Sequence, residues 1–138
     1  MPRLSPGVSP ESIAEFVTTR HLATLTTIRA DGSPHVAPVG FSYDPATCIA
    51  RIIASAGTQK VVNIERGGLV GVSGASVVIC QVDGGRWISL EGKGVVTADP
   101  ERVADACARY EARYQAPRPN QNRVAIEIHV ERILGRLA

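Results

Sequence analysis

Two turn sequences, 29–32 and 83–85, each lie between two segments of β-forming composition. Residues 21–28 mix threonine with apolar residues before the first turn, and residues 86–97 alternate after the second. Asp-Gly and Gly-Gly pairs are typical of the tight turns that join antiparallel strands. The two arms of each turn are therefore expected to pair, which constrains much of the chain to an antiparallel sheet.

Three further segments extend this sheet. Residues 33–43 return from the first turn, residues 48–55 are apolar, and residues 124–133 alternate between apolar and polar side chains. Alternation with a period of two is the pattern of a half-buried strand. Pro34 and Pro38, in the first of these segments, lack the N–H that a sheet ladder uses, which predicts an edge, a bulge or a ligand there.

Residues 69–82 form a long β-branched stretch that Gly71 and Gly74 interrupt. Glycine inside a strand pattern marks a bulge or a tight connection. The stretch therefore predicts either one bulged strand or two strands joined by a short turn.

Helices are expected at two other places. Ser9 stands before Pro10, a pairing typical of a helix N-terminus, and this helix should end near Thr19. Asp99 also precedes a proline, and the apolar residues that follow share one helical face suited to packing on a sheet. That second helix is expected to end before Gln115.

Residues 51–63 form an apolar strand, a small-residue turn and the start of a helix, which is expected over 58–66 and stopped by the glycines at 67–68. Free N–H groups in the first helical turn and the helix dipole favour an anion, and Lys60 adds a full positive charge. This pattern indicates a phosphate-binding turn. An ordinary strand–turn–helix junction, with Thr58 as N-cap and Lys60 solvated, is the alternative.

The 138 residues fit one domain, 1–138, with no need for a disulfide or a metal to complete its core. The elements add up to a mainly β fold of six to seven antiparallel strands with short peripheral helices. Because unpaired edges are a liability in such a sheet, a closed barrel is the favoured architecture.

Composition narrows the possible partners. The net charge is only +2 and the basic residues form no run, so nucleic acid is not an expected partner. The three cysteines have no metal-site or disulfide-framework spacing, and no segment reaches the ~18 apolar residues of a membrane span. A soluble cytoplasmic protein without a metal site is expected.

The chemistry-bearing residues do not form a hydrolytic set. His21, His35 and His129 stand apart in the sequence, and no G-x-S-x-G motif occurs. A strand rich in proline and glycine, the phosphate-binding turn and Trp87 instead suit a flat, phosphorylated cofactor. Trp87 is equally suited to a core or to a dimer interface.

Several motifs, taken in order along the chain, carry a family resemblance: 21–27, 29–39, Ser55 with Lys60 and Asn63, 83–87, and 90–92. With them, the chain resembles the pyridoxamine-phosphate-oxidase-like family of FMN-binding-like split β-barrels, from about His21 to the last strand. The segments 84–92 and 114–120 look closest to the actinobacterial branch that uses coenzyme F-420, a deazaflavin.

The resemblance implies a homodimer with two cofactor sites at the subunit interface. It assigns a backbone shelf beside the cofactor ring, a lining for the ring and ribityl chain, and a phosphate grip. These are Val36, Ala37, Pro38 and Val39 for the shelf, Ile53, Ala54 and Ser55 for the lining, and Gln59 and Lys60, supported by Asn63, for the phosphate. Trp87 would face the cofactor of the partner subunit.

The same resemblance implies hydride transfer from reduced F-420 to a conjugated acceptor, with biliverdin, reduced to bilirubin, as the favoured one. Arg118 and Arg123 are candidate anchors for the acceptor's carboxylates, and no catalytic residue is assigned. An FMN-dependent enzyme of the same fold and a non-catalytic F-420, FMN or haem-binding protein are the alternatives. Three departures matter. Gln59 stands where many relatives have arginine, and the stretch 69–82 is longer than in close relatives, which bears on how the barrel pairs there. The segment 128–132 lacks the signature of the vitamin B6 oxidases, which disfavours that activity.

Overall fold

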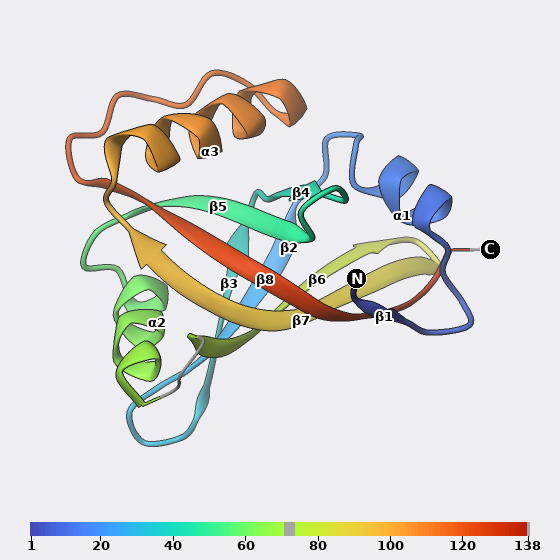
Figure 1. Cartoon of the computed structure of the whole chain (residues 1–138), viewed down its shortest axis with the longest axis horizontal. Helices are drawn as coiled ribbons and strands as arrows, with labels where there is room; N and C mark the ends of the chain where they lie inside the picture. Colours follow the sequence, from blue (N-terminus) through green and yellow to red (C-terminus); the bar gives the residue numbers. More distant parts are fainter. Residues whose placement is uncertain (71–73, 138) are drawn as a thin grey trace.

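The computed structural model describes residues 1–70 and 74–137. Seven strands follow one another as hydrogen-bonded neighbours in the order β3-β2-β6-β7-β8-β5-β4, and every pairing along this path is antiparallel (Figure 1). Their bounds are β2 (Ala23–Ile28), β3 (Pro34–Val39), β4 (Ser42–Asp44), β5 (Ile49–Ser55), β6 (Ala75–Asp83), β7 (Arg86–Thr97) and β8 (Arg123–Arg136). An eighth strand, β1 (Arg3–Leu4), pairs in parallel with β8.

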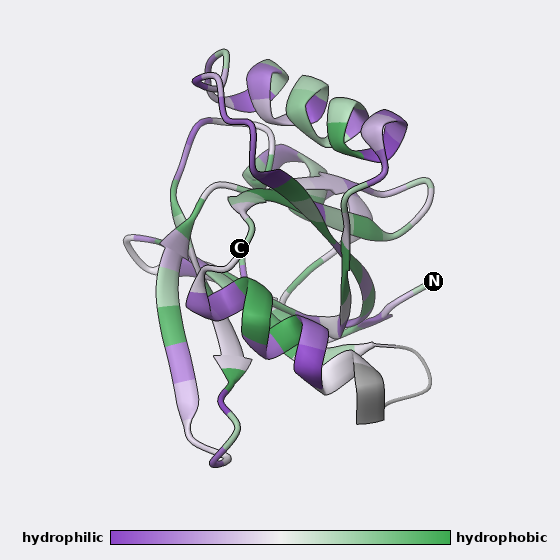
Figure 2. Cartoon of the chain, turned by 90° about the vertical axis from the view of Figure 1, so that its left-hand side faces the viewer, coloured by the Kyte–Doolittle hydropathy of each residue, from purple (hydrophilic) through white to green (hydrophobic). Residues whose placement is uncertain are grey.

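The two edge strands, β3 and β4, stand at opposite ends of this order, yet only Gly40 and Phe41 join them in the sequence. The sheet therefore curls, and it encloses one apolar core. Helix α2 (Gln59–Val70) crosses one end of the barrel, and α3 (Pro100–Arg113) lies outside it over β5 and β8 (Figures 1 and 2). This split barrel confirms the expected fold class. β1 was missed because two residues are too few to show a period.

The edge position of β3 explains its two prolines. Pro38 lies opposite Thr24 of β2, and no strand pairs with the other side of β3 in the described sheet. On an edge strand, the missing N–H of a proline can face solvent, so no carbonyl of a neighbouring strand lacks a donor. Along β3, Pro34, Val36 and Pro38 are exposed, while Val39 is buried. The prediction of an edge at this segment is confirmed.

Two predicted boundaries were wrong. The segment 33–43 is divided, because the chain leaves β3 at Val39 and enters β4 at Ser42. Helix α2 does not stop at Gly67 but continues through Val70. Gly67 serves packing here, since a Cβ on it would come within 2.6 Å of the Ala75 side chain. The part of the predicted strand at 69–70 is therefore helical, and residues 71–73 lie outside the described ranges.

The last strand is longer than the alternating segment, and its polar face is partly covered. Glu127, expected on a solvated face, is buried and pairs with Arg102 of α3. Ala125 is also buried, because α3 lies over this part of β8. The two-residue period therefore did not predict exposure here, because α3 covers part of the outer face of β8.

The helix starts confirm the capping signals. Ser9 accepts the backbone N–H of Ser12 and forms a capping box with it, and α1 (Pro10–Phe16) begins at the expected proline. Asp99 accepts the backbone N–H of Arg102 at the start of α3. Helix α1 ends before Thr19, since its last turn is an irregular one at Val17.

Among residues 1–70 and 74–137, no helix is long and apolar enough to cross a membrane. The same described ranges hold no cluster of three metal-ligating His, Cys, Asp or Glu side chains.

Candidate functional site

An open groove of about 480 Å³ lies on the outer wall of the barrel. Its sides come from the ends of β3 and β5, the first turn of α2, Tyr110 of α3, and the loop 115–122 that leads into β8. The lining residues are Pro38, Val39, Gly40, Ile53, Ala54, Ser55, Thr58, Lys60, Tyr110, Gln115, Ala116, Pro117, Arg118, Asn120 and Arg123.

The groove brings together part of the predicted site. Its lining includes the predicted residues Pro38, Val39, Ile53, Ala54, Ser55 and Lys60, together with Arg118 and Arg123. On β5, Ile53 and Ser55 alternate with the buried Ile52 and Ala54, so the period of the strand turns them outward toward the groove. The lining does not include Val36, Ala37, Gln59, Asn63 or Trp87.

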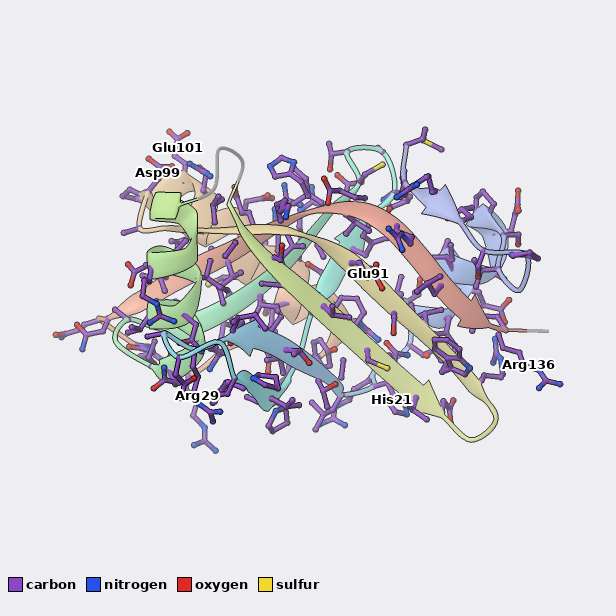
Figure 3. All side chains as sticks on the ribbon, turned by 90° about the horizontal axis from the view of Figure 1, so that it is seen from below. His21, Arg29, Glu91, Asp99, Glu101 and Arg136 are labelled. Atoms are coloured by element: carbon purple, nitrogen blue, oxygen red, sulfur yellow. The ribbon has the colours of Figure 1, made fainter. Side chains whose placement is uncertain are left out.

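Three of these outlying residues lie on strands. Val36 is exposed on the outer face of β3, and Ala37 alternates with it toward the other face. Trp87 lies near the start of β7, opposite Val82 and Arg136, and is 37% exposed. Figure 3 shows Arg136 beside the β6–β7 turn, far from α2, so Trp87 does not reach the groove of its own chain.

Asn63 and Gln59 interact with each other inside α2. The Asn63 side chain is buried, donates to the Thr27 hydroxyl at 3.0 Å, and accepts from the Gln59 amide at 2.7 Å. The Arg66 guanidinium donates to the same Asn63 oxygen at 3.2 Å. Asn63 thus ties α2 to β2 and holds the Gln59 amide along the helix. Lys60, in the same turn, lines the groove.

Thr58 joins the strand to the helix. Its carbonyl accepts the N–H of Val62, as the residue before a helix does, but its hydroxyl donates to the Ser55 carbonyl at 2.9 Å. The N–H groups of the first turn have no carbonyl partners within a helix, so this end of α2 can receive an acceptor from a ligand.

The charges that line the groove all have one sign. Lys60, Arg118 and Arg123 are cationic, and no aspartate or glutamate lines the groove within the described part of the chain. The Arg123 guanidinium donates to the Arg118 carbonyl, which fixes it along the loop. The groove is therefore suited to a ligand with more than one negative charge.

Tyr110 supplies a flat wall that the sequence did not reveal. Its ring stacks on Tyr114 with a centroid distance of 4.8 Å and an interplanar angle of 26°. The Tyr114 hydroxyl donates to the His21 carbonyl at 2.7 Å and accepts the Phe41 N–H at 3.1 Å, and burial raises its pKa. Gly40 lets the rings approach, because a Cβ there would lie 3.0 Å from the Tyr110 ring. The four-residue spacing of the tyrosines was the available signal.

Arg113 fixes the end of α3 against the barrel. Its buried guanidinium donates to the Thr19 and Phe41 carbonyls at 3.0 and 2.6 Å and to the Gln81 side-chain oxygen at 2.8 Å. Burial lowers the pKa of Arg113. The three segments that meet here include the link between β3 and β4, so Arg113 helps to set the position of the wall of the groove.

No histidine lines the groove in the described part of the chain. His21 is paired with the Leu22 carbonyl at 2.8 Å, and His129 is exposed on β8. The Nδ1 atom of His35 is buried without a hydrogen bond in the described ranges. A proton for any reaction in the groove must therefore come from another group, from the ligand or from water.

The strand order, the curled sheet and the groove on its outer wall define a split β-barrel protein. The chain belongs to the pyridoxamine 5'-phosphate oxidase family, whose family model matches residues 9–136. The resemblance inferred from the sequence is thereby confirmed.

The chain is 52% identical over 128 residues to the "F420H(2)-dependent biliverdin reductase" of Mycobacterium tuberculosis, covering 93% of this chain and 88% of that protein. It also superposes on the crystal structure of a conserved hypothetical protein from Mycobacterium tuberculosis, with a TM-score of 0.77, 23% identity and coverage of 97% and 89%. A solved "F420 Reductase" gives a TM-score of 0.63 at 20% identity, covering 86% of this chain and 93% of that one.

Proposed function

We propose that this protein is an oxidoreductase that binds coenzyme F-420 in the groove and reduces a conjugated acceptor, with biliverdin reduced to bilirubin. The observation that carries the proposal is that the groove gathers an apolar shelf, a helix N-terminus and three cationic side chains at one place. The 52% identity with a reductase of this type supports the choice of cofactor and acceptor.

The residues present fit this cofactor. Pro38, Val39 and Ile53 offer an apolar surface for a planar ring, while Lys60 and the start of α2 offer N–H donors and positive charge for a phosphate. F-420 also carries a polyglutamate tail, which this cationic groove can accept because no carboxylate of residues 1–70 or 74–137 lines it. When bound, the cofactor supplies the hydride, and the protein positions it.

The loop 115–122 and the start of β8 are proposed to hold the acceptor. Arg118 and Arg123 line the groove, where they can bind the carboxylates of a tetrapyrrole. Tyr110 faces the same space with a ring that is fixed by its stacking partner. Positioning of the acceptor against the cofactor ring is the catalytic contribution that this wall would make.

A homodimer is part of the proposal. The outer face of β3, β2, β6 and β7 carries exposed apolar side chains, and Figure 3 shows β6 and β7 extending clear of α2 toward their shared turn. These side chains include Leu22, Ile28, Val36, Val82 and Trp87. Covering this face with a second copy would bury them and would bring Trp87 toward the partner's groove. We place the dimer in the cytoplasm, where its three cysteines stay reduced.

Titration with F-420 and with FMN tests the cofactor. Lys60→Ala removes a charge-assisted contact and should raise the Kd for F-420 by about 10- to 100-fold. Lys93→Ala is the matched control, because Lys93 lies on β7, donates to the Ser76 hydroxyl and does not line the groove. Equal Kd values for the two variants would contradict the proposed site.

An acceptor assay tests the reaction. Purified protein with reduced F-420 should oxidise it when biliverdin is added, and the rate should fall in Lys60→Ala at subsaturating cofactor. Tight FMN in the purified protein would favour the FMN-dependent alternative, and tight F-420 binding without turnover of any acceptor would favour the non-catalytic one.

A further inference from the structure

Asn120 lies in the loop 115–122, opposite the end of β5. Its side-chain Nδ2 donates to the Ser55 hydroxyl oxygen at 2.7 Å, and its Oδ1 accepts the backbone N–H of Asn122 at 2.9 Å. Both Asn120 and Ser55 line the groove. The contact therefore couples the loop to one of the residues expected beside the cofactor.

The direction of the Asn120–Ser55 hydrogen bond is set by the backbone. A backbone N–H can only donate, so the end of the Asn120 amide that faces Asn122 must be the oxygen. The NH₂ end then faces Ser55. The loop is itself held to the strand, because the N–H of Ala56 donates to the Asn122 carbonyl at 2.8 Å. A flip of the Asn120 amide would place its NH₂ group against the Asn122 N–H and lose that hydrogen bond.

A serine hydroxyl has one proton to donate and two lone pairs that accept. Because Asn120 donates to Ser55, the Ser55 proton is not used in their contact, and no acceptor in residues 1–70 or 74–137 receives it. The Ser55 carbonyl, by contrast, already accepts from Thr58. The unused donor of this pair lies at the groove.

We infer that Asn120 is a positioning residue that holds the Ser55 hydroxyl as a hydrogen-bond donor toward the ligand in the groove. The ligand must then present an acceptor at this point, such as a carbonyl oxygen, a ribityl oxygen or a ring nitrogen with a lone pair. This inference rests on the proposed function, because it takes the cofactor to be that ligand.

A double-mutant cycle separates this role from a general effect on the loop. Asn120→Asp keeps an oxygen for the Asn122 N–H, but its second oxygen accepts the Ser55 proton and so removes the donor from the groove. Asn120→Asp and Ser55→Ala should each raise the Kd for F-420 by about tenfold at pH 7, the scale of one hydrogen bond that includes a charged group. In the Ser55→Ala background, Asn120→Asp should add no more than about twofold.

The added charge is controlled in two ways. Its repulsion of an anionic cofactor persists in the Ser55→Ala background, so the cycle subtracts it. Asn122→Asp places the same charge on the same loop, on an exposed side chain other than the one that bonds Ser55, and should raise the Kd by no more than about twofold in either background. Thermal unfolding of each variant checks that the loop change leaves the barrel folded.

A pH series gives a readout that a merely structural role would not move. As the pH falls from 7 to about 4, near the ordinary pKa of an aspartate, the carboxylate introduced by Asn120→Asp gains a proton that it can donate to Ser55. The Kd of Asn120→Asp relative to wild type should therefore recover toward one, whereas that of Ser55→Ala relative to wild type should not.

The outcomes are distinct. Coupled effects with recovery at low pH support the inference. Additive effects, or an Asn120→Asp loss that does not change with pH, would overturn the role of Asn120 even if wild type binds F-420 and Lys60→Ala weakens that binding. A wild-type protein that binds neither F-420 nor FMN would overturn both the inference and the proposed function.

Discussion

Arg113→Lys tests how the end of α3 is fixed to the barrel. The wild-type guanidinium reaches three acceptors on three segments, namely the carbonyls of Thr19 and Phe41 and the side chain of Gln81. A lysine ammonium is a point donor that cannot span these positions as a planar fork does. At least one buried acceptor then lacks a donor, and the stacking of the guanidinium on the Phe41 ring, at 4.7 Å, is also lost.

The magnitude follows from these contacts. A buried acceptor without a partner costs about 1–3 kcal/mol, and a loss of one to two such bonds with the ring contact gives about 2–4 kcal/mol. For a domain of this size, that corresponds to a fall in Tm of about 7–14 °C. Desolvation does not offset this loss, because lysine keeps the buried positive charge and its ammonium is more strongly hydrated than a guanidinium.

Urea denaturation monitored by circular dichroism measures this change through the midpoint at constant slope. Arg109→Lys is the control, because Arg109 lies on the same helix but pairs with Asp44 and Asp105 near the surface, where ion pairs contribute about 0–1 kcal/mol. An Arg113→Lys protein within about 0.5 kcal/mol of wild type would refute the reasoning, since the mapped bonds would then carry little stability.

Two other perturbations have expected outcomes. Gly40→Ala should lower cofactor affinity more than stability, because the new Cβ displaces the Tyr110 and Tyr114 rings by a few tenths of an ångström at the wall of the groove, and parallel Kd and Tm measurements check this. Hydrogen bonds from Thr47 and from the Ala46 N–H hold the pKa of Asp44 below its ordinary 3.8. The stability that Asp44 contributes is therefore complete above its unfolded pKa and is lost as the pH falls through its folded pKa. Below about pH 4, the unfolding midpoint of Asp44→Asn should therefore depend less on pH than that of wild type.

Local signals in the sequence predicted most of the barrel. The alternation over 86–97 matches β7 at both ends, and the prolines of β3 mark a real edge. Tertiary packing explains the errors. Gly67 reads as a helix stop, yet close contact with Ala75 keeps it inside α2, and α3 buries Glu127 on a face that the period of two places in solvent.

In the candidate site, too, some residues could be predicted from local sequence and others are brought to the groove only by the fold. Ser55 and Lys60 were predictable because one strand–turn–helix segment contains both. Tyr110 and Asn120 were not, because they reach the groove from a helix and a loop that are distant from β5 in sequence. The phosphate role of Gln59 stays a prediction, and its contact with Asn63 could not be predicted because only the folded helix makes it.

The gap between β3 and β4 has a consequence for how such an enzyme could change. No ladder joins these two edges in the described sheet, and the side chains of Arg113 and Tyr114, at the end of α3, bond the Phe41 backbone in the link between them. One wall of the groove is therefore built from side chains and a loop rather than from sheet hydrogen bonds. Substitutions at 115–122 could alter acceptor preference during evolution while the framework that holds the phosphate end stays intact.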